Sequence, residues 1–369
     1  MKYLRFYMAA TSRNTGKTTC TLGLIAALRG MGIHAGYCKP AGQQFVVVDG
    51  NRVDKDAPVF AGQFGFRLIP ELHSPVILAP GLVSRYLDDP EQFDFRTRIL
   101  DAAARLEQEY DLVVYEGTGH PGVGSAIDAS NADVASWLDA LVILVVEAGI
   151  GKALDQIELN LSLFREKGVK PAGVIVNKAV PEKIGKIRHY LSRRLSQSGI
   201  PLLGVLPFEE SLEEVTLCEV AEAVQGRLLR NLACESIRMT GIAAARSVQS
   251  SDPAALVGKI LVAQADRLAT LVPMLEAPAR QAALPSALLV CGKAEFTPSL
   301  EAFFKRTRMP VISSQMDSLD AAIALQQIEV KHRAADSRRT ERAIELFRAH
   351  VSLDALRMAA PDALAGAPA

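Results

Sequence analysis

The stretch Ala10–Thr19, with the sequence ATSRNTGKTT, combines residue types that suit phosphate binding. It follows an apolar run at residues 6–9 and precedes a helical pattern at residues 20–28, so it joins a strand to a helix. Its spacing is that of a P-loop, G-x-x-x-x-G-K-[ST], with Thr11 in place of the first glycine. Gly16 would let backbone N–H groups close around a phosphate where the helix begins. We therefore expect a nucleotide-binding loop.

Two side chains of this loop indicate its chemistry. Lys17 would reach the outer phosphates, and the Thr18 hydroxyl would bind a magnesium ion. The alternative is a plain strand–turn–helix in which both residues are incidental. Lys17 argues against that alternative, because a cation in the first turn of a helix opposes the helix dipole unless an anion binds there.

Carboxylates at later positions are candidate partners of the magnesium ion. Glu116 ends the apolar run that starts at Leu112 and is followed, after Gly117, by a glycine-rich loop, Thr118–Ser125. A carboxylate binds magnesium directly or through water, although Glu116 could also be a solvated acid at a strand end. Asp56 is the second candidate, and a helix N-cap explains it equally well.

Two further strand ends carry polar side chains. Lys39, before Pro40, could neutralise charge on a transferring phosphoryl group, or it could be a solvated lysine. Asn177 offers the donor and acceptor that match an adenine edge, or it could be a turn residue. His120 is a lone histidine in the glycine-rich loop, and no Ser-His-Asp or Cys-His arrangement can be assembled.

Strands and helices are expected to alternate through the first 211 residues. We expect an α/β fold, because near-continuous apolar strands indicate a mainly parallel sheet with helices on both faces. The candidates Thr11–Thr18, Lys39, Glu116 and Asn177 all follow strands, and open sheets of this kind bind ligands at the carboxyl ends of their strands. The expected strands are 33–38, 111–115, 141–146, 173–177 and 202–206, the expected helices 91–109, 131–139, 152–167 and 181–198, with a hairpin at 45–53 and an irregular stretch at 66–90.

The pattern changes near residue 212 and predicts a second, smaller α/β domain. The predicted domains are 1–211, 212–334 and a C-terminal piece, 335–369, made of a charged helix and a disordered tail from Pro361. For the second domain the pattern predicts a helix at 212–229, strands at 241–243, 258–263, 286–292 and 309–313, and helices at 266–276, 298–305 and 317–327.

Composition bounds the function. Lys+Arg and Asp+Glu both number 41 in 369 residues, so the global charge predicts neither a nucleic-acid partner nor a membrane surface. The five cysteines form no C-x-x-C pair, and we expect a reducing cytoplasm without a zinc site or disulfide framework. The most apolar run, residues 141–146, is far shorter than the roughly 20 residues of a membrane helix.

Together these residues resemble the dethiobiotin synthetase-like P-loop family. That group includes the ATP domain of cobyrinic acid a,c-diamide synthase and the N-terminal domain of long phosphotransacetylases. The resemblance covers about 210 residues and is carried by several pieces in the same order: Thr11–Thr18, Lys39-Pro40, Asp56-Ala57, Glu116–Gly119, Val176–Lys178 and Gly204–Pro207.

The resemblance implies Mg²⁺ and ATP as cofactors and assigns roles to residues. It implies magnesium at Thr18, Asp56 and Glu116, and phosphoryl-group stabilisation by Lys17 and Lys39. The nucleotide-binding set that it implies is Asn14, Thr15, Gly16, Lys17, Thr18, Thr19, Asn177 and Pro207. Dethiobiotin synthetases usually carry Glu-Gly-Ala-Gly-Gly where this chain has Glu116–His120, so dethiobiotin is not the expected product.

The second domain resembles a DRTGG domain, which follows this P-loop domain in long phosphotransacetylases. Asp266-Arg267 and Cys291–Lys293 carry this likeness, and the latter departs from the usual Thr-Gly-Gly. Neither an acetyl-transfer nor a glutamine amidotransferase domain is expected. We expect an ATP-dependent synthetase acting on an unidentified small carboxylate or carbamate, or alternatively a nucleotide-sensing regulatory protein. Both domains resemble modules that self-associate, which predicts a homodimer or larger homo-oligomer.

Overall fold

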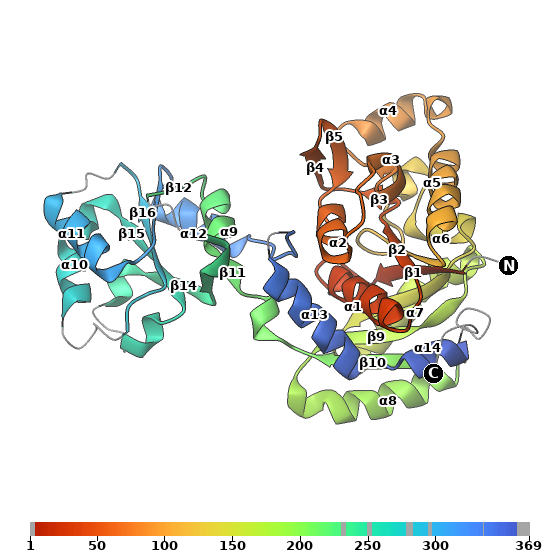
Figure 1. The fold of residues 1–369 in the computed structure, drawn as a ribbon. Helices are drawn as coiled ribbons and strands as arrows, with labels where there is room; N and C mark the ends of the chain where they lie inside the picture. The colour runs from red at the N-terminus through yellow and green to blue at the C-terminus, as the bar shows by residue number, and fades with distance from the viewer. Residues whose placement is uncertain are drawn as a thin grey trace. The chain divides into compact units, whose positions relative to one another are not determined.

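The chain forms two compact units, shown in Figure 1. The computed structural model describes residues 4–229, 234–248, 253–277, 283–293, 297–334 and 336–359. The first unit comprises residues 1–209 and 332–369, and the second comprises residues 210–331. The predicted separate C-terminal piece is therefore corrected, because the chain returns to the first unit at His332. The tail predicted to be disordered from Pro361 lies outside the described residues.

Six parallel strands form the sheet of the first unit, in the order β10-β9-β8-β1-β7-β2. Strand β1 lies in the middle, where Tyr7 pairs with Tyr115 of β7 and with Val142 of β8. Its neighbours are buried along most of their length, as expected for a sheet covered on both faces. The predicted α/β class is confirmed. The strands are β1 Leu4–Ala10, β2 Ala35–Cys38, β7 Leu112–Glu116, β8 Leu141–Glu147, β9 Pro171–Ala179 and β10 Leu202–Pro207.

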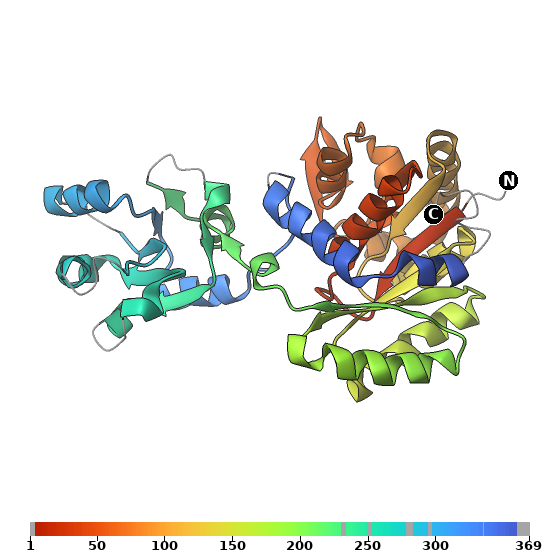
Figure 2. The same cartoon turned by 60° about the horizontal axis from the view of Figure 1, so that its bottom comes forward.

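Helices cover both faces of this sheet (Figures 1 and 2). One face packs against apolar residues of α5 Phe95–Glu109, α6 Asn131–Trp137, α7 Gly151–Glu166 and α8 Ile184–Ser196. The segment that returns after the second unit supplies α13 Ser337–His350, which packs against α1 Lys17–Gly30, and α14 Leu353–Ala359, which packs against β9 and β10. A helix from the C-terminal end of the chain thus lies on the helix that starts at the P-loop.

The region between β2 and α5 is built from short elements. The predicted hairpin is present, with Asp49 and Gly50 both at positive φ in its two-residue turn, as type I′ turns require. The stretch 66–90, expected to be irregular, instead contains short helices, because Pro70 and Leu82 each start a turn that packs on the core. These elements are β3 Ala41–Gly42, β4 Phe45–Val48, β5 Asn51–Asp54, α2 Ala57–Phe64, α3 Pro70–His73, β6 Val76–Ile77 and α4 Leu82–Asp88.

The second unit has a five-stranded sheet in the order β12-β17-β16-β15-β14, of which only the β12–β17 pair is antiparallel. Its strands are β12 Arg227–Leu228, β14 Gly241–Ala244, β15 Lys259–Gln264, β16 Ala287–Cys291 and β17 Val311–Ser314, and β11 Val215–Thr216 pairs with β13 Arg238–Met239. Its helices are α9 Leu217–Ala223, α10 Leu268–Glu276, α11 Pro298–Thr307 and α12 Ser318–Gln326. Short 3-10 turns in the two units are η1 Pro90–Gln92, η2 Ser125–Ile127, η3 Pro181–Lys183, η4 Glu210–Leu212, η5 Cys234–Ser236, η6 Ala245–Val248, η7 Pro253–Leu256 and η8 Ala265–Arg267.

The long helix predicted at 212–229 is wrong. Thr216 and Glu219 form a reciprocal capping box, so α9 begins only at Leu217. Val215 lies in a strand paired with Met239 instead. A capping box marks a helix start whatever the periodicity around it.

Two of the cysteines also depart from expectation. Cys218 of α9 forms a disulfide with Cys234, with 5.2 Å between their Cα atoms, a separation that a disulfide can span. The other three, Cys20, Cys38 and Cys291, are buried free thiols. Scattered spacing therefore did not exclude a single disulfide. In the described part of the chain, no helix combines the length and the hydropathy that crossing a bilayer needs.

Candidate functional site

The loop between β1 and α1 has the backbone geometry of an anion-binding turn. Its first residue is tied to the sheet, since the Thr11 N–H donates to Val145 O at 3.1 Å. Gly16 is the N-cap of α1 with φ 99°, and neither it nor the first turn of the helix supplies a capping side chain or an acid. The first N–H groups of a helix have no intrahelical acceptor, so those of α1 are suited to an anion such as phosphate.

Asn177 packs directly against this loop. At the end of β9 it is 5% exposed, and its Nδ2 donates to Thr15 O at 2.8 Å. A Cβ on Gly16 would lie 2.0 Å from that nitrogen, so only glycine fits there. Asn177 thus supports the loop between β1 and α1, and its predicted contact with adenine stays a prediction.

The two side chains that open α1 both point to β7 and the loop after it. Lys17 Nζ donates to Gly119 O at 3.2 Å, and Thr18 Oγ1 donates to Glu116 Oε1 at 2.9 Å. Because β1 and β7 are adjacent, with Met8 opposite Glu116, the loop after β1 and the carboxylate that ends β7 meet. The structure therefore brings the predicted Lys17, Thr18 and Glu116 together.

Lys39 lies at the centre of three buried carboxylates. Its Nζ is 3.3 Å from Asp54 Oδ1 and 3.4 Å from Glu116 Oε1, and it also contacts Asp56 Oδ2 at hydrogen-bonding range. All four residues are less than a tenth exposed. The interpretation of Lys39 as a solvated lysine is therefore wrong.

Burial and charge act in opposite directions on this cluster. Burial by itself lowers the pKa of Lys39, but the charges of Asp56, Asp54 and Glu116 outweigh it and raise that pKa well above its usual value. Burial raises the pKa of Glu116 and of Asp54, and Lys39 partly offsets both shifts. The ammonium ion therefore stays protonated and makes it possible to bury the carboxylates as ions.

The donor set around Glu116 fits a magnesium ion. Glu116 Oε2 is buried and has no hydrogen-bond partner among the described residues, which leaves a carboxylate oxygen available to a hard cation. The Thr18 hydroxyl lies on the other oxygen of the same carboxylate. The described residues contain no group of three or more His, Cys, Asp or Glu side chains placed to hold a metal ion, so the available set is one hydroxyl and the carboxylates of Glu116 and Asp56.

Asp54 and Asn131 belong to this site, although the sequence did not single them out for it. Asp54 Oδ1 accepts from the Asp56 N–H at 3.0 Å, so Asp54 positions the second predicted acid. Asn131, at the start of α6, holds the glycine-rich loop: its Oδ1 accepts from Thr118 N at 3.0 Å, and its Nδ2 donates to Thr118 O and to His120 O at 2.6 and 2.7 Å. The sequence signal that could have indicated Asn131 was its place directly after Ser130, which forms the capping box of α6.

The remaining predicted residues lie along the same edge of the sheet. Asn14 lies within the loop in a left-handed conformation, with φ 58°, and Thr15 Oγ1 donates to Ser12 O at 3.0 Å. Thr19 Oγ1 is 3.0 Å from Nε2 of His332. Pro207 ends β10 opposite Ala179 of β9, two residues beyond Asn177.

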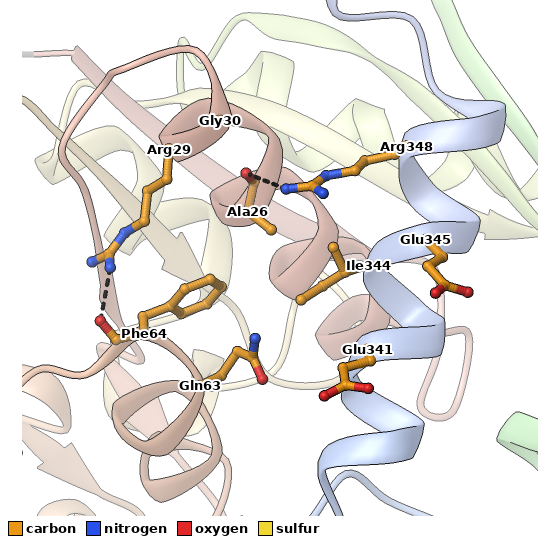
Figure 3. Close-up of a pocket in the computed structure, with 9 residues that line it drawn as sticks. All are labelled: Ala26, Arg29, Gly30, Gln63, Phe64, Glu341, Ile344, Glu345 and Arg348. Carbon is orange, nitrogen blue, oxygen red and sulfur yellow. Dashed lines mark hydrogen bonds between the residues drawn. The ribbon is translucent and has the colours of Figure 1, made fainter.

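A pocket of about 590 Å³ lies elsewhere in the first unit, between α1, α2 and α13 (Figure 3). Arg29 donates to Phe64 O at 2.8 Å on one side of it, and Arg348 donates to Ala26 O at 3.1 Å on the other. It lies toward the end of α1 remote from the P-loop, and none of the predicted site residues lines it.

The sequence of this chain matches one family model and is similar to several known proteins. The model of the AAA_26 family, described as an AAA domain, matches residues 5–216. A phosphate acetyltransferase of Nitrosomonas europaea is 26% identical over 371 residues, which are 95% of this chain and 51% of that protein. An ATP-dependent dethiobiotin synthetase of Rhodococcus erythropolis is 30% identical over 231 residues, 60% of this chain and 96% of that protein. A cobyric acid synthase of Nocardia farcinica is 28% identical over 274 residues, 68% of this chain and 52% of that protein.

The extent of these matches differs between the relatives. The chain spans about half the length of the phosphate acetyltransferases that it matches. The match to the dethiobiotin synthetase is confined to 60% of this chain. The resemblance to dethiobiotin synthetases, cobyrinate-type synthases and phosphotransacetylases that the sequence suggested is confirmed. The likeness of the second unit to a DRTGG domain stays a prediction.

Proposed function

This chain belongs to the AAA_26 family, and from that membership we propose that its first unit binds Mg-ATP and transfers the γ-phosphoryl group to a small carboxylate or carbamate. The observation that carries the proposal is the convergence on Glu116, which accepts from the Thr18 hydroxyl at 2.9 Å and from Lys39 Nζ at 3.4 Å and keeps one oxygen that has no partner among the described residues. These groups come from three separate segments of the chain. A structural ion pair alone would not need the P-loop hydroxyl.

The proposed roles follow from charge and position. The N–H groups at the start of α1 and Lys17 would bind the phosphates, and Lys39 would stabilise the negative charge that develops on the transferring group. Thr18, Glu116 and Asp56 would hold Mg²⁺, which neutralises the β- and γ-phosphate charge when it is bound. A carboxylate oxygen of the acceptor would form a bond to the γ-phosphorus while the bond to the leaving ADP oxygen breaks.

Lys17 has a further part in this proposal. It donates to Gly119 O in the glycine-rich loop after β7, and we assign this loop to the acceptor. When a phosphate takes that donor, the glycine-rich loop loses a tie and is held by Asn131. ATP binding would in this way release the glycine-rich loop from Lys17 before the acceptor binds, which is consistent with ordered addition of the two substrates.

A second candidate function is nucleotide sensing without turnover. The match to a phosphate acetyltransferase extends over 95% of this chain and therefore includes the second unit. The match to a dethiobiotin synthetase covers only 60% of the chain. In that case the first unit would bind ATP without turnover, and the bound ATP would regulate the activity of another protein. Self-association, a cytoplasmic location and a DRTGG-like second unit are further parts of both candidates and stay predictions.

Measurement of phosphate release from Mg-ATP tests the proposal. We expect the parent protein to release phosphate, with an increase in the presence of the right acceptor, and we expect Lys17→Ala and Glu116→Gln to lose at least about a hundredfold in rate, as for other electrostatic contributors to a transition state. Lys152→Ala is the matched control, because Lys152 also follows a strand of the same sheet but is exposed and paired with Glu147.

The outcomes separate the two functions. ATP binding that depends on Lys17, measured by calorimetry, with no phosphate release under any acceptor would contradict the enzyme and favour the sensor. A thermal-shift screen of small carboxylates and amines, run with and without ATP, would identify the acceptor through its ATP-dependent stabilisation.

A further inference from the structure

A residue of the returning segment contacts the P-loop helix. His332 Nε2 lies 3.0 Å from Thr19 Oγ1, and Thr19 directly follows the predicted magnesium ligand Thr18. His332 Nδ1 is buried and has no hydrogen-bond partner among the described residues. An unpaired buried polar atom is unfavourable, so this histidine is held by its contact with Thr19 and by its surroundings rather than by a full set of hydrogen bonds.

The surroundings of His332 are charged and buried. Burial and, to a lesser extent, the positive charge of Arg339 lower its pKa to about 4, against the opposing effect of the carboxylates of Asp56 and Asp336. Asp336 and Arg339 form an ion pair at 3.4 Å with both side chains 1% exposed, and Asp336 caps α13. The electrostatic environment of His332 thus includes Asp56 of the predicted metal site and two residues at the start of α13.

Helix α13 then follows α1 along its length. At Gly23 the helices are so close that a Cβ would lie 2.1 Å from Cβ of Phe347, and Arg348 donates to Ala26 O at 3.1 Å (Figure 3). After α13 the backbone bonds to the sheet, where Ser352 N donates to Leu203 O at 2.8 Å. The returning segment, residues 332–334 and 336–352, is thus held at the P-loop, along α1 and at strand β10.

We propose that His332 is a positioning residue of the nucleotide site, which fixes the Thr19 hydroxyl, and that nucleotide binding is thereby coupled to docking of the returning segment on α1. This inference rests on the proposed function only in that Thr19 lies against the bound nucleotide. It adds a residue from beyond the second unit to a site that the matched residues 5–216 would otherwise contain entirely. Coupling of this kind is reciprocal, so ATP must also favour the docked segment.

Binding of Mg-ATP by the full chain, measured by calorimetry, tests the positioning role. We expect His332→Ala to weaken binding about five- to tenfold, the size of one net hydrogen bond plus lost order in Thr19. His332→Gln, whose amide can occupy the place of Nε2, should restore affinity to within about twofold. His350→Ala, at the other end of α13, is the control and should bind ATP as the parent does.

A double-mutant cycle with Thr19→Val shows whether His332 acts through Thr19. We expect His332→Ala to cost nothing further once the hydroxyl is gone. Equal affinity of His332→Ala and the parent, or additive losses in the double variant, would overturn the inference and leave the proposed ATP site standing. If the parent itself binds no ATP, both fall.

Amide hydrogen exchange provides a readout that a purely structural histidine would not change. In the parent, ATP should slow exchange in α13 by about threefold or more, and this protection should be absent in His332→Ala and present in His332→Gln. Protection by ATP that is equal in all three proteins would overturn the coupling. Urea unfolding of each variant confirms that it is folded.

Discussion

At the scale of single residues, Lys39 is the group on which the electrostatics of the site depends. It contacts Asp54, Asp56 and Glu116 in a part of the protein where each of the four side chains is nearly inaccessible to water. A buried charge of one sign is costly unless the opposite charge is close. Lys39 therefore has a structural consequence in addition to its proposed role at the phosphoryl group.

Lys39→Met should lower the free energy of unfolding by about 3–5 kcal/mol at pH 8, the usual cost of breaking a buried ion pair from one side. Without the ammonium, the pKa values of Asp54 and Glu116, already raised by burial, rise further. Their folded state then binds protons more tightly than the unfolded state, so stability is lost as pH rises through the raised pKa values and is regained in acid. Urea unfolding at pH 5 and pH 8 measures this difference, and Lys152→Met serves as the control.

The lowered pKa of His332 predicts that its contribution to the free energy of unfolding depends on pH in the opposite sense. Its pKa is about 4 in the folded chain against about 6.5 unfolded, so the unfolded state takes up the proton first. The contribution of neutral His332 to stability is therefore complete above about pH 6.5 and is lost as pH falls toward 4. His332→Gln should show a smaller loss of stability than the parent between pH 6.5 and 4 by urea unfolding, and identical slopes would contradict the assigned burial.

At the scale of elements, the contact between α1 and α13 depends on a missing side chain. Gly23 lies within α1 and is buried, and the atoms nearest to an added Cβ are Cβ and ring carbons of Phe347. Cβ is fixed to the backbone of α13 and cannot turn away, so one helix would have to move. Close packing of this kind tolerates little added volume.

A pair of glycine-to-alanine variants tests this contact. Gly23→Ala should destabilise the protein by about 1–3 kcal/mol through overpacking, despite the better helix propensity of alanine. Gly62→Ala, in α2, meets no atom within 4 Å and should be neutral or stabilise by up to about 1 kcal/mol. Thermal unfolding compares the two, and a stabilising Gly23→Ala would show that α13 is not closely packed on α1.

At the scale of the whole molecule, the first unit is discontinuous in sequence. Residues 332–359 supply Ile344, Leu346 and Phe347 to its buried interior. The edge of the sheet also depends on this segment, because Val351 bridges to Gly204 of β10. The second unit is therefore an insertion between two parts of one folding unit, and the first unit should not be complete without residues beyond the inserted one.

Truncation tests this arrangement. A chain that ends at Lys331 should unfold at a temperature several degrees lower or aggregate, because the apolar surface of α1 becomes exposed. A chain that ends at Ala359 keeps α13 and α14 and is the control, with the unfolding temperature of the parent. Calorimetric scans decide between them, and an unchanged transition in the shorter chain would refute the assignment of the returning segment to the first unit.

The sequence by itself determined the alternation of strands and helices in the first unit and the edge of the sheet that holds the site. The P-loop is a local signal, since Gly16 and Lys17 have their meaning within a single turn, and alternating apolar strands and helices predict the parallel sheet. Because parallel strands end at one edge, Lys17, Glu116 and Asn177 could be placed together before their distances were known.

Tertiary structure alone decided the contacts between segments far apart in the chain. The sequence left a solvated lysine as one alternative for Lys39, and the structure removes it by placing Asp54, Asp56 and Glu116 around that side chain. Thr19 contacts His332 across 313 residues of sequence. Periodicity reports which face of an element is apolar but not which distant element covers it. The partner of α1 could therefore be found only where the chain returns and buries that face against α13.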